Sequence, residues 1–459
     1  MSSSRPQVSA RDGPGRSGLR RLWGRAAWPA LALIAFALVG FSLATHLGNP
    51  SRRTLVVASI PYWNIQHGTE VVLANRTAVN EVSPWIYGLT ATGAIVPQYP
   101  PAEAAAVTSD IARLQAAHLQ IVPSIANITG GVWDYPAVSH VLHDPAMMHH
   151  QVDAIVALVQ REKYAGIDID YEELHAGDRQ AFTQFATDLA AALHKRGKVL
   201  SVAVFPQTAT PGPGQPDAAQ DYAALGRIAD QVRVMAYNNH WANSAPGATA
   251  PISWVRAVMR YATSQMPASK VVLGVPLFGY DWPAGGSTPA TTVSWLQALR
   301  LSRQYHASAS YSKAAQAPYF SYVSDGRSHT VWFENAASST AKFQVAKGSG
   351  AAGVYLWMYG YEDPGTWSSL RSVLPISGPN ATSTSSVVPL CPGGSSRCSS
   401  SVSTSRSGAR SAWYGSSRQP PPAWRAAVRA RSRPRYLAGL RCPCVPALPA
   451  PARSSGRSR

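Results

Sequence analysis

The stretch "YAGIDIDYEEL", residues 164–174, decides the fold. It places three carboxyls, Asp168, Asp170 and Glu172, at alternate positions. The side chains between them are apolar or aromatic: Ile167, Ile169 and Tyr171. Side chains at i, i+2 and i+4 of a β-strand share one face, so the carboxyls point one way and the apolar side chains the other. In a chain with only 14% charged residues, this column indicates a buried strand whose polar face carries chemistry.

From Thr54 onward, short apolar runs alternate with helical stretches. The strand-like runs are 54–60, 79–88, 119–125, 165–171, 199–205, 231–237, 270–276 and 353–359. The helical stretches between them include 103–117, 147–163, 178–196, 251–265 and 336–349. Val- and Ile-rich strands spaced by helices are typical of a parallel sheet covered on both faces. Eight such runs over about 320 residues predict an α/β fold, a (β/α)8 TIM barrel. The alternative, a doubly wound open sheet, has no Gly-rich dinucleotide fingerprint to support it.

The spacing between the seventh and eighth runs is wider than elsewhere. Within this gap, residues 318–334 alternate in character on either side of Asp325-Gly326, which is a hairpin signal. We therefore predict a small α+β insertion over about 278–334, between the seventh and eighth strands. The whole barrel, with this insertion, is expected to span residues 54–375.

The net charge of +18 is carried by the two ends of the chain. Residues 1–53 hold eight arginines and one aspartate, which gives +7, and residues 376–459 hold thirteen arginines and no acid, which gives +13. The segment between them is left with a net charge of −2. A nearly neutral barrel does not offer a basic groove, so no nucleic-acid partner is expected.

The two ends have the composition of a targeting segment and a tail. Several arginines precede an apolar run over 26–45, which at roughly 20 residues is long enough to span a bilayer with the N-terminus inside. Ser42-Leu43-Ala44 also fits a cleavage site, so a signal peptide and an uncleaved membrane anchor stay open. We expect a secreted or cell-envelope protein. The Ser-, Pro- and Arg-rich residues 376–459 have the composition of a disordered tail and hold all four cysteines, which excludes a thiol nucleophile from the barrel.

The carboxyl column predicts acid–base chemistry. Burial and like charge both raise carboxyl pKa values, so at least one of the three is expected to hold a proton near neutral pH, as a general acid must. Glu172 ends the column at the carboxyl end of its strand, where barrel enzymes place their chemistry. Two alternatives are solvated loop acids, which the intervening apolar residues disfavour, and a Mg²⁺ or Ca²⁺ site, which no second acidic cluster supports. We expect no metal and no other cofactor.

With these residues in view, the chain resembles glycoside hydrolase family 18, the chitinase-like enzymes. The family signature Asp-Gly-x-Asp-x-Asp-x-Glu reads here from Ala165 to Glu172, with Ala165 in place of the first Asp. The family's Met-x-Tyr-Asp after the sixth strand is present as Met235-Ala236-Tyr237-Asn238, and its floor tryptophan after the eighth strand as Trp357. The stretches 271–282 and 353–367 resemble the subgroup that contains bacterial spore-cortex and cell-wall N-acetylglucosaminidases. The resemblance covers roughly residues 54–370.

The resemblance implies a retaining glycosidase without an enzymatic nucleophile, in which the 2-acetamido oxygen of the substrate attacks the anomeric carbon. It implies that Glu172 is the general acid and then the base, that Asp170 accepts the acetamido N–H, and that Asp168 shares a proton with Asp170. Tyr237 would orient the acetamido oxygen and Trp357 would stack under the sugar ring. Asn238 keeps the shape of the family's Asp without its charge, which predicts an altered pH profile. The implied substrate is a β-1,4-linked polymer containing N-acetylglucosamine, either peptidoglycan or chitin.

Further aromatic residues follow or end strand-like runs, where sugar-stacking platforms would lie. They are Tyr62, Trp63, Trp85, Tyr87, Trp241, Tyr280 and Trp282. All of these except Tyr87 and Trp282 form the predicted substrate-binding set, together with Met235, Asn238 and Trp357. The alternative function is a non-catalytic, lectin-like sugar-binding barrel, which the intact Glu172 and Tyr237 argue against. We expect a monomer whose partner is the polysaccharide, with membrane contact only through an uncleaved N-terminal segment.

Overall fold

The computed structural model describes residues 54–376, except 213–215 and 287. The predicted targeting segment, the basic C-terminal tail and all four cysteines therefore lie outside the described residues. Within the described part of the chain, no helix is long and apolar enough to cross a membrane.

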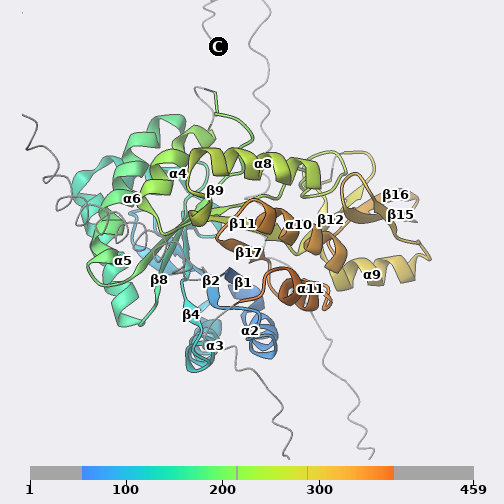
Figure 1. Cartoon of the computed structure of the whole chain (residues 1–459), viewed down its shortest axis with the longest axis horizontal. Helices are drawn as coiled ribbons and strands as arrows, with labels where there is room; N and C mark the ends of the chain where they lie inside the picture. Colours follow the sequence, from blue (N-terminus) through green and yellow to red (C-terminus); the bar gives the residue numbers. More distant parts are fainter. Residues whose placement is uncertain (1–53, 213–215, 287, 377–459) are drawn as a thin grey trace, which may run out of the picture. The chain divides into compact units, whose positions relative to one another are not determined.

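Eight parallel strands close into a barrel (Figure 1). They are β1 (Leu55–Pro61), β2 (Glu81–Leu89), β5 (Ser124–Ala126), β8 (Gly166–Asp170), β9 (Val199–Val204), β10 (Gln231–Val234), β11 (Val271–Pro276) and β17 (Gly353–Trp357). Each pairs with the next in chain order, and β1 pairs with both β2 and β17, which closes the ring. Two short strands extend the sheet at β2: β3 (Ile95–Pro97) and β4 (Gln120–Ile121). The predicted (β/α)8 fold is confirmed.

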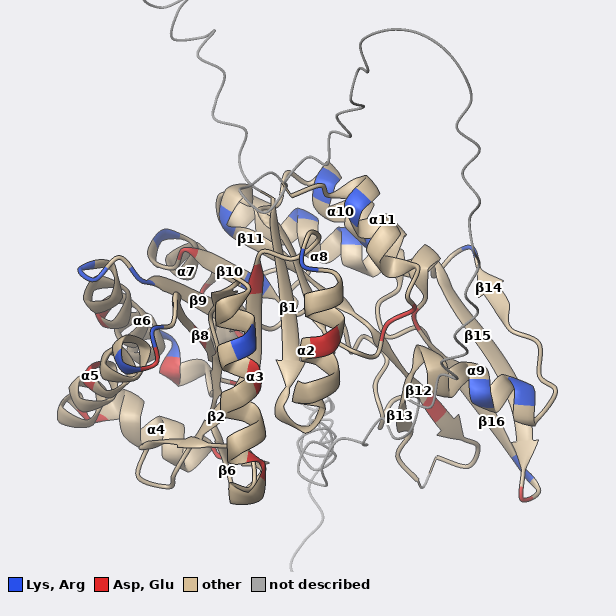
Figure 2. Ribbon diagram, turned by 90° about the horizontal axis from the view of Figure 1, so that it is seen from below, with Lys and Arg blue, Asp and Glu red and all other residues tan. Residues whose placement is uncertain are grey.

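Helices connect the strands and cover the outside of the barrel. They are α2 (Ile65–Ala74), α3 (Ala104–Ala116), α4 (Tyr135–His143), α5 (Pro145–Arg161), α6 (Arg179–His194), α7 (Tyr222–Ile228), α8 (Ile252–Gln265), α10 (Ala336–Gly348) and α11 (Thr366–Val373). Local sequence explains where they begin. At α5, the Asp144 side chain accepts the backbone N–H groups of Ala146 and Met147, and Pro145 occupies the first helical position, where a missing N–H costs nothing. Figure 2 shows both acidic and basic residues on the outer helices, in keeping with the nearly neutral net charge of the barrel.

Between β11 and β17 the chain forms the predicted insertion. Its five-stranded antiparallel sheet comprises β12 (Phe278–Pro283), β13 (Thr291–Ser294), β14 (Ser310–Ser312), β15 (Ala317–Ser324) and β16 (Arg327–Trp332), with α9 (Trp295–Gln304) packed on it. The β15–β16 hairpin turns at Asp325 and Gly326, whose φ angles of 50° and 71° are those of a type I′ turn. A separate apolar cluster that includes Phe320, Val331 and Phe333 stabilises the insertion.

Strand β8 shows how the barrel sorts its side chains. Tyr171, just past the strand, lies with its ring 5.7 Å from Phe185 of α6 at an interplanar angle of 18°. Ile167 and Ile169 are fully or almost fully buried. Asp168, on the alternate face, contacts the two neighbouring strands instead. The predicted division between an apolar outer face and an acidic inner face is therefore present.

Candidate active site

The acidic column lies at the carboxyl end of the fourth barrel strand. Asp168 and Asp170 belong to β8, and Glu172 follows the strand by two residues. All three side chains are buried, with exposed fractions of 1%, 7% and 5%. Three carboxyls can persist at this depth only if neighbouring groups satisfy them, because an unpaired buried charge is costly.

Asp168 is bonded from the strands on both sides of β8. Ser124 of β5 donates to its Oδ2 over 2.7 Å, and Ser201 of β9 donates to its Oδ1 over 2.6 Å. Both serines lie directly opposite Asp168 in the parallel register. A slip of one residue would turn either serine to the outer face, so the register of the barrel itself builds this contact.

A fully buried arginine completes the surroundings of Asp168. The Nη1 atom of Arg233, on β10, lies 3.2 Å from Asp168 Oδ2, and its Nη2 donates to Glu81 Oε1 over 2.6 Å. The guanidinium also donates to Ser83 over 2.7 Å and lies over the ring of Tyr355, 5.4 Å from its centroid. The column thus contacts a buried cation as well as hydroxyl groups.

Our sequence analysis did not single out Arg233 or Glu81, although a signal was present. Arg233 precedes Met235 by two residues and Tyr237 by four, so strand alternation places it on the same inward face. Glu81 precedes Trp85 by four residues on β2 in the same way. Reading inward from each rim residue in steps of two would have found both charges.

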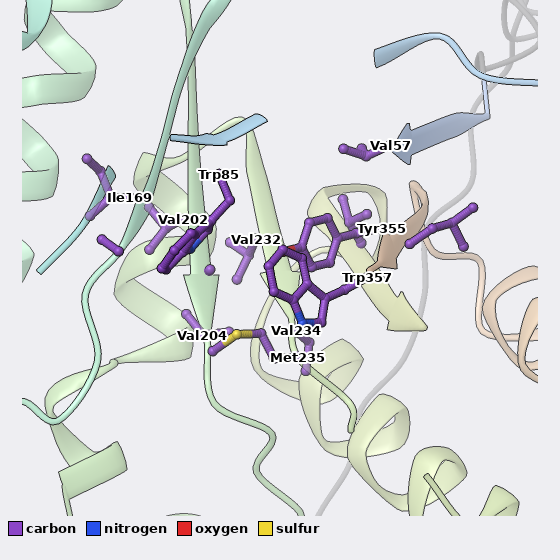
Figure 3. Close-up of a cluster of buried hydrophobic side chains, with 14 of the residues drawn as sticks. Val57, Trp85, Ile169, Val202, Val204, Val232, Val234, Met235, Tyr355 and Trp357 are labelled. Carbon is purple, nitrogen blue, oxygen red and sulfur yellow. The ribbon is translucent and has the colours of Figure 1, made fainter. Parts of the chain in front are cut away.

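Asp170 contacts an aromatic cluster at the same end of the barrel. The indole Nε1 of Trp85 donates to Asp170 Oδ2 over 3.0 Å. The ring of Trp85 lies 5.9 Å from that of Trp63, in the turn Tyr62–Asn64 after β1, and 6.2 Å from that of Trp357, at the end of β17. Figure 3 shows Trp85 and Trp357 among the buried side chains of this region, with Met235 and Tyr355 beside them. The structure therefore brings these predicted binding residues together with Asp170.

Glu172 is fixed through its backbone. The side chain of Asn127, fully buried just after β5, accepts the Glu172 N–H over 2.7 Å and donates to the Glu172 carbonyl over 2.9 Å. The Gln220 amide donates to the carbonyl of the preceding Tyr171 over 3.1 Å. Asn127 is a third residue that sequence analysis missed, and a lone Asn after a strand gives no periodic signal by which to find it.

Tyr237 lies near both upper carboxyls. Burial raises the pKa of Tyr237 well above its ordinary value, and the proximity of Tyr355, Asp170 and Glu172 raises it further. Its exposed fraction is 7%. A phenol with a raised pKa keeps its proton at neutral pH and can donate it in a hydrogen bond.

Asn238 links the barrel to the insertion. Its φ of 62° lies in the left-handed region, which asparagine tolerates better than most residues. Thr249 Oγ1 accepts its backbone N–H over 3.2 Å, and the Tyr280 hydroxyl, from β12, donates to its Oδ1 over 2.9 Å. A second link lies nearby, where Trp282 Nε1 donates to the carbonyl of Trp241 over 3.2 Å.

The remaining rim aromatics divide into two groups. Tyr62, half-buried, lies edge-to-face with Trp63 at 5.1 Å, at the same end as Asp170. Tyr87 lies apart from this group, because its hydroxyl bonds that of Tyr164, just before the amino end of β8, over 2.9 Å. The register of β2 against β5 shifts between Trp85 and Tyr87, and this irregularity breaks the alternation that would have kept Tyr87 on the inward face.

The chain matches the model of a known protein family. The model of glycosyl hydrolases family 18 matches residues 89–362, more than half of the chain. The chain therefore belongs to glycosyl hydrolase family 18. Among the residues that the structure describes, no group of three or more His, Cys, Asp or Glu side chains is arranged to hold a metal ion.

Several of the similar proteins are bacterial. The chain is 37% identical over 231 residues to the cortical fragment-lytic enzyme of Bacillus subtilis, which covers 50% of this chain and 54% of that protein. It is 34% identical over 249 residues to the putative sporulation-specific glycosylase YdhD of the same species, covering 53% and 59%. The chain thus spans little more than half the length of these curated relatives. The crystal structure of the Bacillus cereus spore cortex-lytic enzyme SleL superimposes with a TM-score of 0.65 at 28% identity, over 71% of this chain and 75% of that one. A chitinase from Chromobacterium violaceum gives 0.64 at 28% identity, over 70% and 99%.

Proposed function

We propose that this protein is a retaining glycosidase that hydrolyses β-1,4 linkages in polymers containing N-acetylglucosamine. Family membership supports the reaction class. The observation that carries the proposal is the joint placement of Glu172, Asp170 and a protonated Tyr237 at the carboxyl end of the barrel. The same three groups disfavour the alternative of a non-catalytic sugar-binding barrel, which has no need of a buried acid.

Each side chain has a defined task in this proposal. Glu172 protonates the glycosidic oxygen and later accepts a proton from water, while Asn127 keeps its backbone in place. Asp170, oriented by Trp85, accepts the acetamido N–H and stabilises the positive charge that develops when the acetamido oxygen attacks the anomeric carbon. Tyr237 donates its hydroxyl to that oxygen. Because the substrate supplies the nucleophile, the usual separation rule for two catalytic carboxyls does not apply.

The polymer is proposed to be peptidoglycan. The cortical fragment-lytic enzyme and the SleL structure are named for action on spore cortex, whereas the Chromobacterium violaceum structure is named a chitinase. Digestion of purified peptidoglycan and of chitin, followed by identification of the released reducing ends, distinguishes the two. We also propose that the protein acts at the cell envelope, on the strength of the basic and apolar sequence of residues 1–53. Fractionation of cells that produce the full chain tests this.

The decisive test compares the wild type with Glu172→Gln on a chitin oligosaccharide and on peptidoglycan fragments. Glutamine keeps the shape of the side chain but cannot transfer the proton, so turnover is expected to fall by about 10²–10⁴-fold. Equal turnover by both proteins would refute the assignment of Glu172. Binding of the oligomer by a wild type that does not cleave either polymer would establish the lectin-like alternative instead.

A further inference from the structure

The interior of the barrel holds one cation between two carboxylates. Arg233 is fully buried, with one terminal nitrogen 2.6 Å from Glu81 and the other 3.2 Å from Asp168. Gln231 donates to the second oxygen of Glu81 over 2.8 Å. A buried charge is retained only when it is paired and hydrogen-bonded, and this arrangement meets both conditions.

The chemistry of arginine restricts what Asp168 can do. A guanidinium keeps its positive charge in proteins, so Asp168 Oδ2, 3.2 Å from Arg233 Nη1, lies against a permanent cation. Ser124 and Ser201 supply two further contacts, one on each oxygen. A proton on Asp168 would give up its attraction to Arg233 and leave Glu81 to offset the buried cation.

The charged and titratable groups that surround Asp168 come from four strands. They are Glu81 on β2, Arg233 on β10, Tyr355 on β17 and Asp170 on β8 itself. Burial raises the pKa of Glu81, and the attraction of Arg233 opposes this effect. The pKa of Tyr355 is raised, first by burial and then by the charges of Asp170 and Asp168, so Tyr355 adds no charge at neutral pH. Arg233 is therefore the one cation in this set.

We propose that Arg233 is a positioning residue that holds Asp168 as a fixed carboxylate, so that the acidic column exchanges its proton only at Asp170 and Glu172. This inference rests on the proposed glycosidase function and deepens it. It replaces the expectation that Asp168 shares a proton with Asp170: the charge of the column is offset by a fixed cation. Asp170 can then ionise when positive charge develops on the substrate, because the charge of Asp168 beneath it is already neutralised.

Trp85 provides a reporter for this claim that does not require activity. Its indole N–H donates to Asp170, so the Nε1–H resonance in ¹⁵N-labelled protein follows the ionisation of that carboxyl, and Trp85→Phe assigns the signal. In Arg233→Met, the midpoint of the titration is expected to rise by about 1–3 pH units, because an opposite charge close to a carboxyl favours its ionised form by about this much. Arg233→Lys, which keeps the charge, is expected to stay near the wild-type midpoint.

Two further variants separate this role from general stabilisation. Glu81→Gln leaves Arg233 in place and removes a competing negative charge, so the midpoint is expected to fall. If Arg233→Met does not fold, the Trp85 midpoint of Glu81→Gln alone tests the inference. Lys342→Met is the matched control, because Lys342 and Glu334 form the other fully buried ion pair among the described residues, 2.7 Å apart and only 1% and 2% exposed. Lys342→Met is expected to lower stability without moving the Trp85 midpoint.

The acidic limb of the pH–rate profile on a chitin oligosaccharide is expected to move with the Trp85 midpoint. An unmoved or lowered midpoint in folded Arg233→Met, or an unmoved one in Glu81→Gln, would overturn the inference. If the Trp85 midpoint shifts as expected in the variants while the wild type hydrolyses neither chitin nor peptidoglycan, the inference about Arg233 is upheld and the proposed function is refuted. The two ideas therefore fail by different results.

Discussion

Replacing Asn127 by alanine tests whether activity depends on the backbone of Glu172, the proposed general acid, being held in place. The substitution removes one acceptor and one donor, both bonded to Glu172 at 2.7 and 2.9 Å. Each bond is buried, and a buried backbone group left without its partner costs about 1–3 kcal/mol. With two such groups, we expect Asn127→Ala to lower the free energy of unfolding by about 2–4 kcal/mol when partial relaxation is included.

The effect on catalysis is expected to be larger than the loss of stability alone explains. Without Asn127, the segment after β8 can shift, and misplacement of a catalytic group by about 1 Å can cost about 100-fold in rate. We expect kcat to fall by about that factor at a temperature where the variant remains folded. KM is expected to change little, because Asn127 acts through Glu172 and is fully buried.

Asn80 offers a matched control at the opposite end of the barrel. Its side chain also makes two backbone bonds, accepting from Val56 over 2.9 Å and donating to Thr54 over 2.7 Å, at the start of β1. Asn80→Ala is therefore expected to cost similar stability and to leave kcat near the wild-type value.

The assay combines denaturant unfolding of both variants with initial rates on a chitin oligosaccharide, measured well below each unfolding midpoint. Equal losses of kcat in the two variants would show that the effect is global destabilisation. A normal kcat in a destabilised Asn127→Ala would refute the positioning argument directly.

Three further outcomes are expected. Asn238→Asp places a carboxyl 2.9 Å from the Tyr280 hydroxyl and is expected to retain activity with a displaced pH–rate curve; an unmoved curve contradicts the importance of this position. Burial raises the pKa of Glu362 to about 7 from 4.5, so its contribution to stability is complete below pH 4.5 and is lost as pH rises through 7, by at most about 3 kcal/mol. The free energy of unfolding of Glu362→Gln is therefore expected to depend less on pH between 5 and 8 than that of the wild type. An unchanged pH dependence in denaturant unfolding contradicts the raised pKa of Glu362. Tyr237→Phe is expected to lower kcat by about 100-fold, as loss of a donor to a developing charge does, and a loss confined to KM would place Tyr237 in ground-state binding.

The fold was predictable because its signals are local. Each barrel strand is a short apolar run. The β15–β16 hairpin is indicated by Asp325-Gly326, both of which have positive φ. The order of the column on β8 follows from alternation alone, since Asp168 and Asp170 differ by the two-residue period of a strand. Local rules suffice wherever one element determines the outcome.

The prediction failed or stopped where a second element decides the outcome. Alternation on β2 holds for Trp85, but a change in its register against β5 displaces Tyr87. Asn127 is 45 residues from Glu172 in sequence, and nothing near either residue indicates their contact. Such contacts depend on which strands become neighbours, and only closure of the barrel fixes that.

The pairing of Glu81 with Arg233, 152 residues apart, shows what closure adds to the chemistry. At the base of the column, Asp168 shares Arg233 with Glu81, whereas above it the Asp170 side chain accepts from the Trp85 indole and the Glu172 backbone bonds Asn127. The cost of a second negative charge is therefore expected to rise from the base of the column to its carboxyl end, because Arg233 lies at the base, 3.2 Å from Asp168. A proton taken up by this column is expected to lie near the top, where the proposed mechanism places the glycosidic oxygen beside Glu172. On this argument the buried cation gives the column a direction, and loss of Arg233 would make ionisation of Asp170 above Asp168 more costly, which is what the Trp85 titration measures.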